Sequence, residues 1–75
     1  MVINYAFTNA GVSMDFDNEE SVFMFKDKIL YIKSNFKNNT VKFVFSCEDG
    51  ESTITATFED LDSTEVFYRE ALTMA

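Results

Sequence analysis

Apolar and polar residues alternate most clearly between residues 41 and 58. An apolar side chain occupies every second position over residues 41–47 and again over residues 54–58. A period of two is typical of half-buried β-strands. Asp49-Gly50 predicts a type I′ turn between the two strands, because both central residues of that turn need positive φ. This turn would place Phe45 opposite Ile54.

The residues after this hairpin predict an amphipathic helix. Asp62 is expected to cap its first turn, with Glu65 three residues later in the position of a capping box. Phe67 and Ala71 lie at helical spacing and predict the buried stripe, while Glu65 and Arg69 predict an exposed i,i+4 ion pair. These aromatic and aliphatic residues are interpreted as core.

An earlier alternating stretch predicts another hairpin. Residues 2–8 and 12–16 read as strands, and residues 9–11 read as the turn that joins them. A loop at Ala10-Gly11 would place Phe7 opposite Met14.

Residues 21–39 allow two predictions. As strands, they form a hairpin around Lys26–Lys28 that places Val22 opposite Ile32, and a turn at Asn38-Asn39 leads into the strand that begins at Val41. As a helix, they have a start signal at residues 17–20 and a row of apolar residues at helical spacing. That row comprises Val22, Phe25, Ile29, Ile32 and Phe36.

The two predictions share one fold class, α+β with an antiparallel sheet. The first gives a meander of about 4–6 strands with a C-terminal amphipathic helix. The alternative is a ββαββα arrangement with a helix at about residues 19–37. In both cases the chain of 75 residues forms a single small domain.

Composition supports a packed domain with a small core. The chain is 47% hydrophobic, with no Pro and two Gly, which argues against linkers and disorder. A core of this size typically supplies only ~3–5 kcal/mol of stability without a disulfide, metal or partner. A binding partner or self-association is therefore expected.

The sequence offers little catalytic chemistry. It contains no His and one Cys, so we expect no metal site, no internal disulfide and no activated thiol nucleophile. Cys47 lies on the apolar face of its strand and is expected to be a small buried residue. We therefore expect a protein without cofactors that is not an enzyme.

Two further observations bear on location and origin. The N-terminus lacks a basic region, and no apolar run approaches the ~18 residues of a membrane span. We expect a soluble cytoplasmic protein. Nine Phe and the many Asn, Lys and Ile have AT-rich codons and suggest a microbial or viral genome, in which case the location is the host cytoplasm.

Net charge limits the partners. The chain carries a charge of −7, with the positive residues concentrated between positions 26 and 42. A strongly acidic surface disfavours direct binding of nucleic acid or anionic membranes. The acidic residues nearest the predicted C-terminal hairpin and helix are candidates for binding a basic partner: Glu48, Asp49, Glu51, Glu59, Asp60, Asp62 and Glu65.

We therefore expect a small acidic protein–protein interaction module. A phage-type inhibitor or adaptor is the most specific form, one that acts against host defence or mimics nucleic acid and blocks a basic surface on a larger protein, such as a nucleic-acid-binding protein. The alternative is a homo-oligomeric structural or accessory subunit. Its contact surface would use the apolar residues that the meander leaves outside the core, namely Phe23, Phe25, Ile29 and Tyr31.

Overall fold

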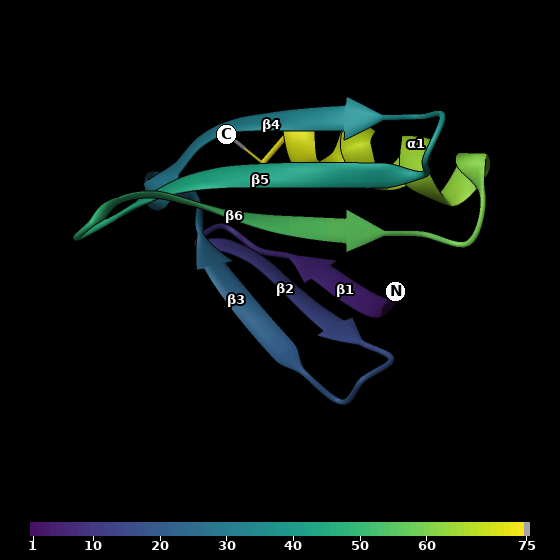
Figure 1. The fold of residues 1–75 in the computed structure, drawn as a ribbon, viewed down its shortest axis with the longest axis horizontal. Helices are drawn as coiled ribbons and strands as arrows, with labels where there is room; N and C mark the ends of the chain where they lie inside the picture. Colours follow the sequence, from purple (N-terminus) through teal and green to yellow (C-terminus); the bar gives the residue numbers. More distant parts are fainter. Residues whose placement is uncertain (75) are drawn as a thin grey trace.

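The computed structural model describes residues 1–74, and these form six strands and one α-helix (Figure 1). The elements are β1 (Val2–Phe7), β2 (Gly11–Phe16), β3 (Ser21–Phe25), a 3₁₀ turn η1 (Lys26–Lys28), β4 (Ile29–Asn35), β5 (Thr40–Cys47), β6 (Gly50–Thr57) and α1 (Leu61–Leu72). The strands make an N-terminal sheet of order β1-β2-β3 and a C-terminal sheet of order β4-β5-β6, both antiparallel. The predicted α+β class with a C-terminal helix is confirmed.

The helix predicted as an alternative for residues 19–37 is wrong, because this stretch forms β3, η1 and β4. The predicted pairing of Val22 with Ile32 is also wrong. β3 pairs with β2, whereas β4 pairs with β5. The turn η1 carries the chain from one sheet to the other, and the strands of the two sheets run obliquely to each other in Figure 1.

The hairpin of β5 and β6 is shifted by two residues from the predicted register. Phe43, not Phe45, lies opposite Ile54, and the loop consists of Glu48 and Asp49. Gly50 does adopt a positive φ of 120°, but Asp49 does not, so the turn is not of type I′. Because the side-chain period of a strand is two, a shift of two residues leaves the predicted faces unchanged.

The other two hairpins differ from their predictions in the same way. Tyr5, not Phe7, lies opposite Met14. Between β4 and β5 the connection is longer than two residues, since Asn35 lies opposite Thr40. The Oδ1 atom of Asn35 accepts a hydrogen bond from the N–H of Lys37 at 3.1 Å, and this side-chain contact stabilises the longer turn.

Phe67 of α1 lies where the two sheets meet. Its ring centroid is 4.8 Å from that of Tyr5 in β1, 5.8 Å from that of Phe43 in β5 and 4.7 Å from that of Phe58. One hydrophobic core therefore joins both sheets and the helix. Its buried residues are Val2, Val12, Met14, Met24, Val41, Phe43, Ala56, Phe58, Phe67 and Ala71.

The helix begins two residues earlier than the predicted cap implied. Asp60, not Asp62, is the N-cap, and its Oδ1 atom accepts a hydrogen bond from the N–H of Ser63 at 2.8 Å. Asp60 has extended backbone angles, which leave its carboxylate free to reach the first turn. The predicted pair of Glu65 and Arg69 is confirmed, with an N···O distance of 3.8 Å.

Cys47 is exposed, and the prediction of a buried thiol is wrong. It lies on the expected face, but at the end of β5 opposite Gly50 and beside the loop. Among residues 1–74, no helix has the length and apolar character that crossing a membrane needs.

Candidate functional site

The predicted acidic residues divide between the two ends of β6. Glu48, Asp49 and Glu51 surround the β5–β6 loop, and all three are exposed. Glu59, Asp60 and Asp62 follow the opposite end of the strand, where β6 leads into α1. A strand of eight residues separates the two groups by about 25 Å, so they form separate surfaces.

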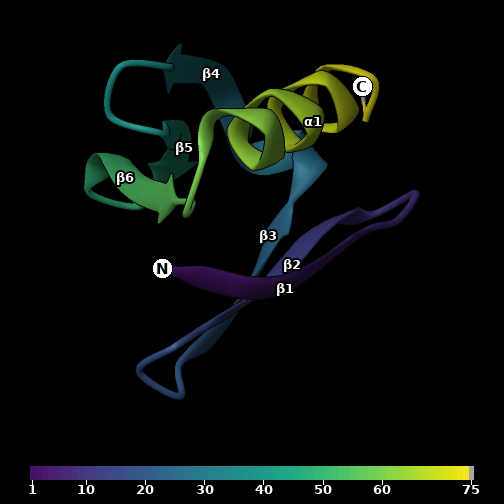
Figure 2. The same cartoon turned by 90° about the vertical axis from the view of Figure 1, so that its right-hand side faces the viewer.

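A third acidic turn lies in the same half of the molecule as the β6–α1 connection. The turn between β2 and β3 contains Asp17, Glu19 and Glu20; it lies at the lower right of Figure 1, below the β6–α1 connection at the right-hand end, and the two stay apart in Figure 2. We call these three residues together with Glu59, Asp60 and Asp62 the acidic end. Sequence reasoning missed this combination, because only the placement of the two sheets brings the turns to the same half of the molecule.

Two acidic side chains near this end form ion pairs, and a third, Glu20, accepts a hydrogen bond from the side-chain amide of Asn18 at 2.7 Å. The Oδ1 atom of Asp17 is 3.0 Å from the amino group of Met1. Glu65, the last of the predicted acidic residues, pairs with Arg69. The other acidic side chains of the acidic end are exposed, and the charge of this surface is correspondingly negative.

Hydrogen bonds to the N–H and hydroxyl of Ser63 hold the pKa of Asp60 below its ordinary value. Asp60 is therefore charged over a wider pH range than a free carboxyl group, and it stabilises the start of α1. Burial raises the pKa of Tyr5, and the negative charge of Glu70 raises it further. Tyr5 belongs to the core beside Phe67, so its shift reflects packing and not a reactive site.

The predicted apolar residues are divided between core and surface. Phe23 is 41% exposed, Phe25 is 60% exposed and Tyr31 is 49% exposed. Ile29 is half-buried against the core, and Leu30 is 51% exposed in its place. A bulge in β4 between Ile29 and Tyr31 explains the exchange, since the extra residue reverses the alternation of faces.

The exposed aromatic residues belong to different sheets. Phe23 and Phe25 lie in β3, with ring centroids 4.9 Å apart in an edge-to-face arrangement. Tyr31 lies in β4 opposite Val44 of the C-terminal sheet. The structure therefore brings Phe23 and Phe25 together, and it does not place Tyr31 on the same strand edge.

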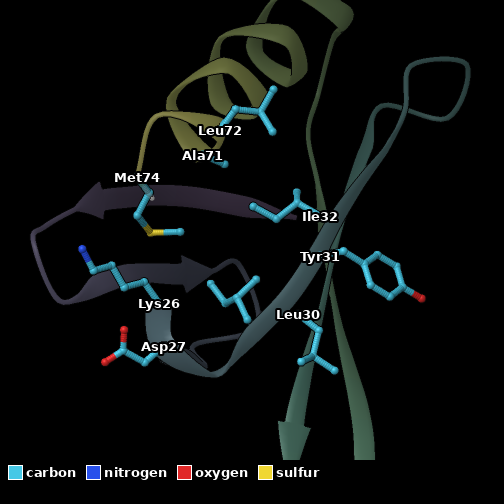
Figure 3. A pocket seen from close by; sticks show the side chains of 9 residues that line it. Lys26, Asp27, Leu30, Tyr31, Ile32, Ala71, Leu72 and Met74 are labelled. Carbon is cyan, nitrogen blue, oxygen red and sulfur yellow. The ribbon is translucent and has the colours of Figure 1, made fainter.

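A cavity of about 410 Å³ lies between β4, η1 and the end of α1 (Figure 3). Its walls are mainly apolar, with Ile32 and Leu72 facing it, while Lys26 and Asp27 supply the charged groups. Small-molecule sites combine such walls with several convergent polar groups. Lys26 and Asp27 are both exposed, and Tyr31 points away from the cavity in Figure 3. The cavity therefore does not show the convergent polar groups that are typical of a small-molecule site.

A second cavity, of about 580 Å³, opens beside β3. One wall consists of β3 residues, including Phe23 and Met24, and the other consists of the ends of β5 and β6, including Phe45 and Ile54. Lys28 and Glu48 also line it. This cavity leaves space along β3 on the side that faces the C-terminal sheet.

Within residues 1–74, no group of three or more Asp, Glu, Cys or His side chains is arranged to hold a metal ion. Comparisons with protein-family models, with curated proteins and with solved structures find no match for this chain.

Proposed function

We propose that the chain is a small acidic protein-interaction module that occupies a basic surface on a larger protein. The observation that carries this proposal is the acidic end, where the β2–β3 turn and the β6–α1 connection present exposed carboxylates from two distant parts of the sequence. Carboxylates in turns at the end of a rigid domain are available to a partner without unfolding it.

The charge distribution supports a basic partner. The chain carries −7 overall, so its long-range field attracts a positive surface and repels nucleic acid and anionic membranes. A phage-type inhibitor or adaptor that mimics the phosphates of nucleic acid is the most specific form of the proposal. The partner would then be a nucleic-acid-binding protein whose basic groove the acidic end fills, inside the cytoplasm of the host.

The test begins with affinity capture from the native cell, followed by mass spectrometry of the captured protein. The association rate of the purified partner is then measured against salt for the wild type and for a Glu59→Lys, Asp62→Lys variant. Asp60 stays unchanged, because it caps α1. Rim charges act mainly on association, so we expect the variant to associate about tenfold more slowly and with a flatter salt dependence.

A matched variant, Glu48→Lys with Glu51→Lys, changes the same number of charges at the opposite end of β6. It should slow association less than the change at the acidic end. The proposal is contradicted if the partner associates with both variants at the wild-type rate, or if the partner has no basic surface.

A second candidate function is that of a homo-oligomeric structural or accessory subunit. The exposure of Phe23 and Phe25 on one strand favours it, because adjoining aromatic side chains on a surface commonly mark an interface. Mass in solution separates the two candidates. High salt should weaken contact with a basic partner and should preserve or strengthen an apolar contact.

A further inference from the structure

The outer edge of β3 is open. Among residues 1–74, β3 pairs only with β2, which leaves its other edge without a neighbouring strand. The strand Ser21–Phe25 contains no charged residue and no Pro, and its register with β2 is continuous. Natural sheets commonly protect an edge with a charge, a Pro or a bulge, and an edge without them is a template for another strand.

The other three edges have some protection. β1 contains a bulge between Val2 and Asn4, and β4 contains one between Ile29 and Tyr31. β6 carries Glu51. β3 is therefore the edge best suited to pairing.

The hydrogen-bond pattern shows which groups of β3 point outward. The N–H of Lys26 donates to the carbonyl of Ala10, and the N–H of Phe16 donates to the carbonyl of Glu20, each at 2.8 Å. Bonded pairs alternate in an antiparallel ladder, so Val22 and Met24 also bond toward β2. The N–H and C=O groups of Ser21 and Phe23 and the N–H of Phe25 point to the open edge, while the C=O of Phe25, the N-cap of η1, accepts the first hydrogen bond of that turn.

We propose that β3 pairs with β3 of a second copy of this chain, antiparallel and centred on Phe23. The outward residues are spaced evenly about Phe23, so a two-fold axis places Phe23 opposite its own copy and Ser21 opposite Phe25 of the other. This register pairs the N–H and C=O of Phe23 with those of its copy, and the N–H of Phe25 with the C=O of Ser21 in the other chain. It joins the two N-terminal sheets into one continuous sheet and brings the exposed Phe side chains of both copies together.

Charge complementarity singles out a second copy as the occupant. The same register brings Glu20 near Lys26 of the other chain, each one residue beyond an end of β3, and the two-fold axis repeats this pair. Both residues extend the β2–β3 ladder and both side chains are exposed. The net charges of the two copies repel each other, but at physiological salt the Debye length is about 8 Å, so distant charges contribute little.

This inference rests on the second candidate function and is independent of the acidic end. It is tested by sedimentation equilibrium of the wild type and of two single variants, Glu20→Lys and Lys26→Glu. Each single variant places like charges near each other twice, so we expect its dissociation constant to rise about tenfold. The double variant Glu20→Lys, Lys26→Glu reverses both charges, and it should restore the wild-type constant to within about twofold.

A backbone variant tests the hydrogen bonds directly. Phe23→Pro removes an N–H that points away from β2, and Pro is tolerated at such positions of an edge strand. We expect the Phe23→Pro variant to keep the circular dichroism spectrum of the wild type and to have the mass of a single chain in solution. Tyr31→Ser is the matched control, because it removes an exposed aromatic residue from the C-terminal sheet and should leave the dimer intact. If Phe23→Pro fails to fold, the charge reversals decide.

The outcomes separate the inference from the candidate function. A wild type that remains one chain up to about 1 mM overturns both. A dimer that resists the single charge changes and Phe23→Pro overturns this inference and leaves self-association through another surface. A double variant as weak as the single variants overturns the antiparallel register.

Discussion

The two sheets have the same plan, three antiparallel strands in chain order, but different outer surfaces. The C-terminal sheet presents hydroxyl groups and positive charges, with Lys42 lying between Lys33 and Thr55. The N-terminal sheet ends in β3, where Phe23 and Phe25 are exposed. A sheet that faces water on one side normally alternates apolar and polar residues. In the C-terminal sheet β6 follows this rule, although β4 exposes Leu30 and Tyr31; β3 does not follow it.

The difference bears on where self-association is expected. Lys33 directly opposite Lys42 costs some stability, because like charges repel across a strand pair. The same charges discourage the packing of another sheet on this face. The N-terminal sheet has no such charge along β3, so self-association is expected there.

Loss of the residue that joins the two sheets should have the largest effect. Phe67 is fully buried between them, and Phe67→Ala should cost roughly 3–5 kcal/mol, which approaches the whole stability of a domain this small. Urea unfolding measures the loss, and Val66→Ala at an exposed position is the control. If NMR shows one sheet still folded in the Phe67 variant, the sheets are independent units and the single core is disproved.

Two glycines allow a comparison between the sheets. In the N-terminal sheet, a Cβ atom on Gly11 would lie 1.9 Å from the carbonyl oxygen of Met24, so β2 and β3 approach too closely for a side chain. Gly11→Ala should therefore cost about 1–3 kcal/mol or more, because the backbone must move. Chemical-shift changes along β3 should accompany it, and an unchanged melting temperature would contradict the close approach.

In the C-terminal sheet the glycine acts through its backbone angle. A Cβ atom on Gly50 would meet nothing within 4 Å, but the φ of 120° is strained for any other residue. Gly50→Val should lower the free energy of unfolding by roughly 1–3 kcal/mol, and the loss should be near the lower limit if the loop relaxes. Shifts confined to the β5–β6 loop distinguish this strain from the displacement expected at Gly11. Thermal melting of both variants tests whether Gly11→Ala lowers the stability more than Gly50→Val does.

The smallest effect should come from the N-cap. The folded-state pKa of Asp60 is depressed, so its contribution is fully present above the unfolded-state pKa and is lost as pH falls through the folded value. Asp60→Asn keeps a capping side chain without the charge. The melting temperature of the wild type should exceed that of the variant at neutral pH, and the difference should shrink in acid. A constant difference from neutral pH to pH about 2 would show that the charge of Asp60 contributes nothing.

Local patterns predicted the C-terminal sheet and helix well. The alternation of Val41, Phe43 and Phe45 placed β5 and its buried face correctly, and the positive φ of Gly50 was expected. The register of the hairpin was not predicted correctly, because a glycine indicates a turn but does not show which position of the turn it occupies. The cap was misplaced for a similar reason, since Asp60 and Asp62 both precede the same apolar residues.

Relations between distant segments could not be read from the sequence. Nothing in Lys26–Lys28 distinguishes a hairpin loop from a turn that leads into another sheet, so β3 and β4 were expected to pair. The bulge that exposes Leu30 and turns Ile29 inward has no sequence signal of its own. The acidic end likewise depends on how the two sheets are placed, and only half of its residues were predicted.

The position of Phe67 also bears on the order of events during synthesis. Val12, Met14 and Met24 leave the ribosome early, but the ring that packs against their sheet belongs to the last element of the chain. Non-local contacts of this kind form only after the intervening chain is available. The core between the N-terminal sheet and the helix therefore cannot form until the helix has left the ribosome. The aromatic edge of β3 is exposed until then. For that interval we expect the edge of β3 to be accessible to chaperones or to β3 of a neighbouring nascent chain.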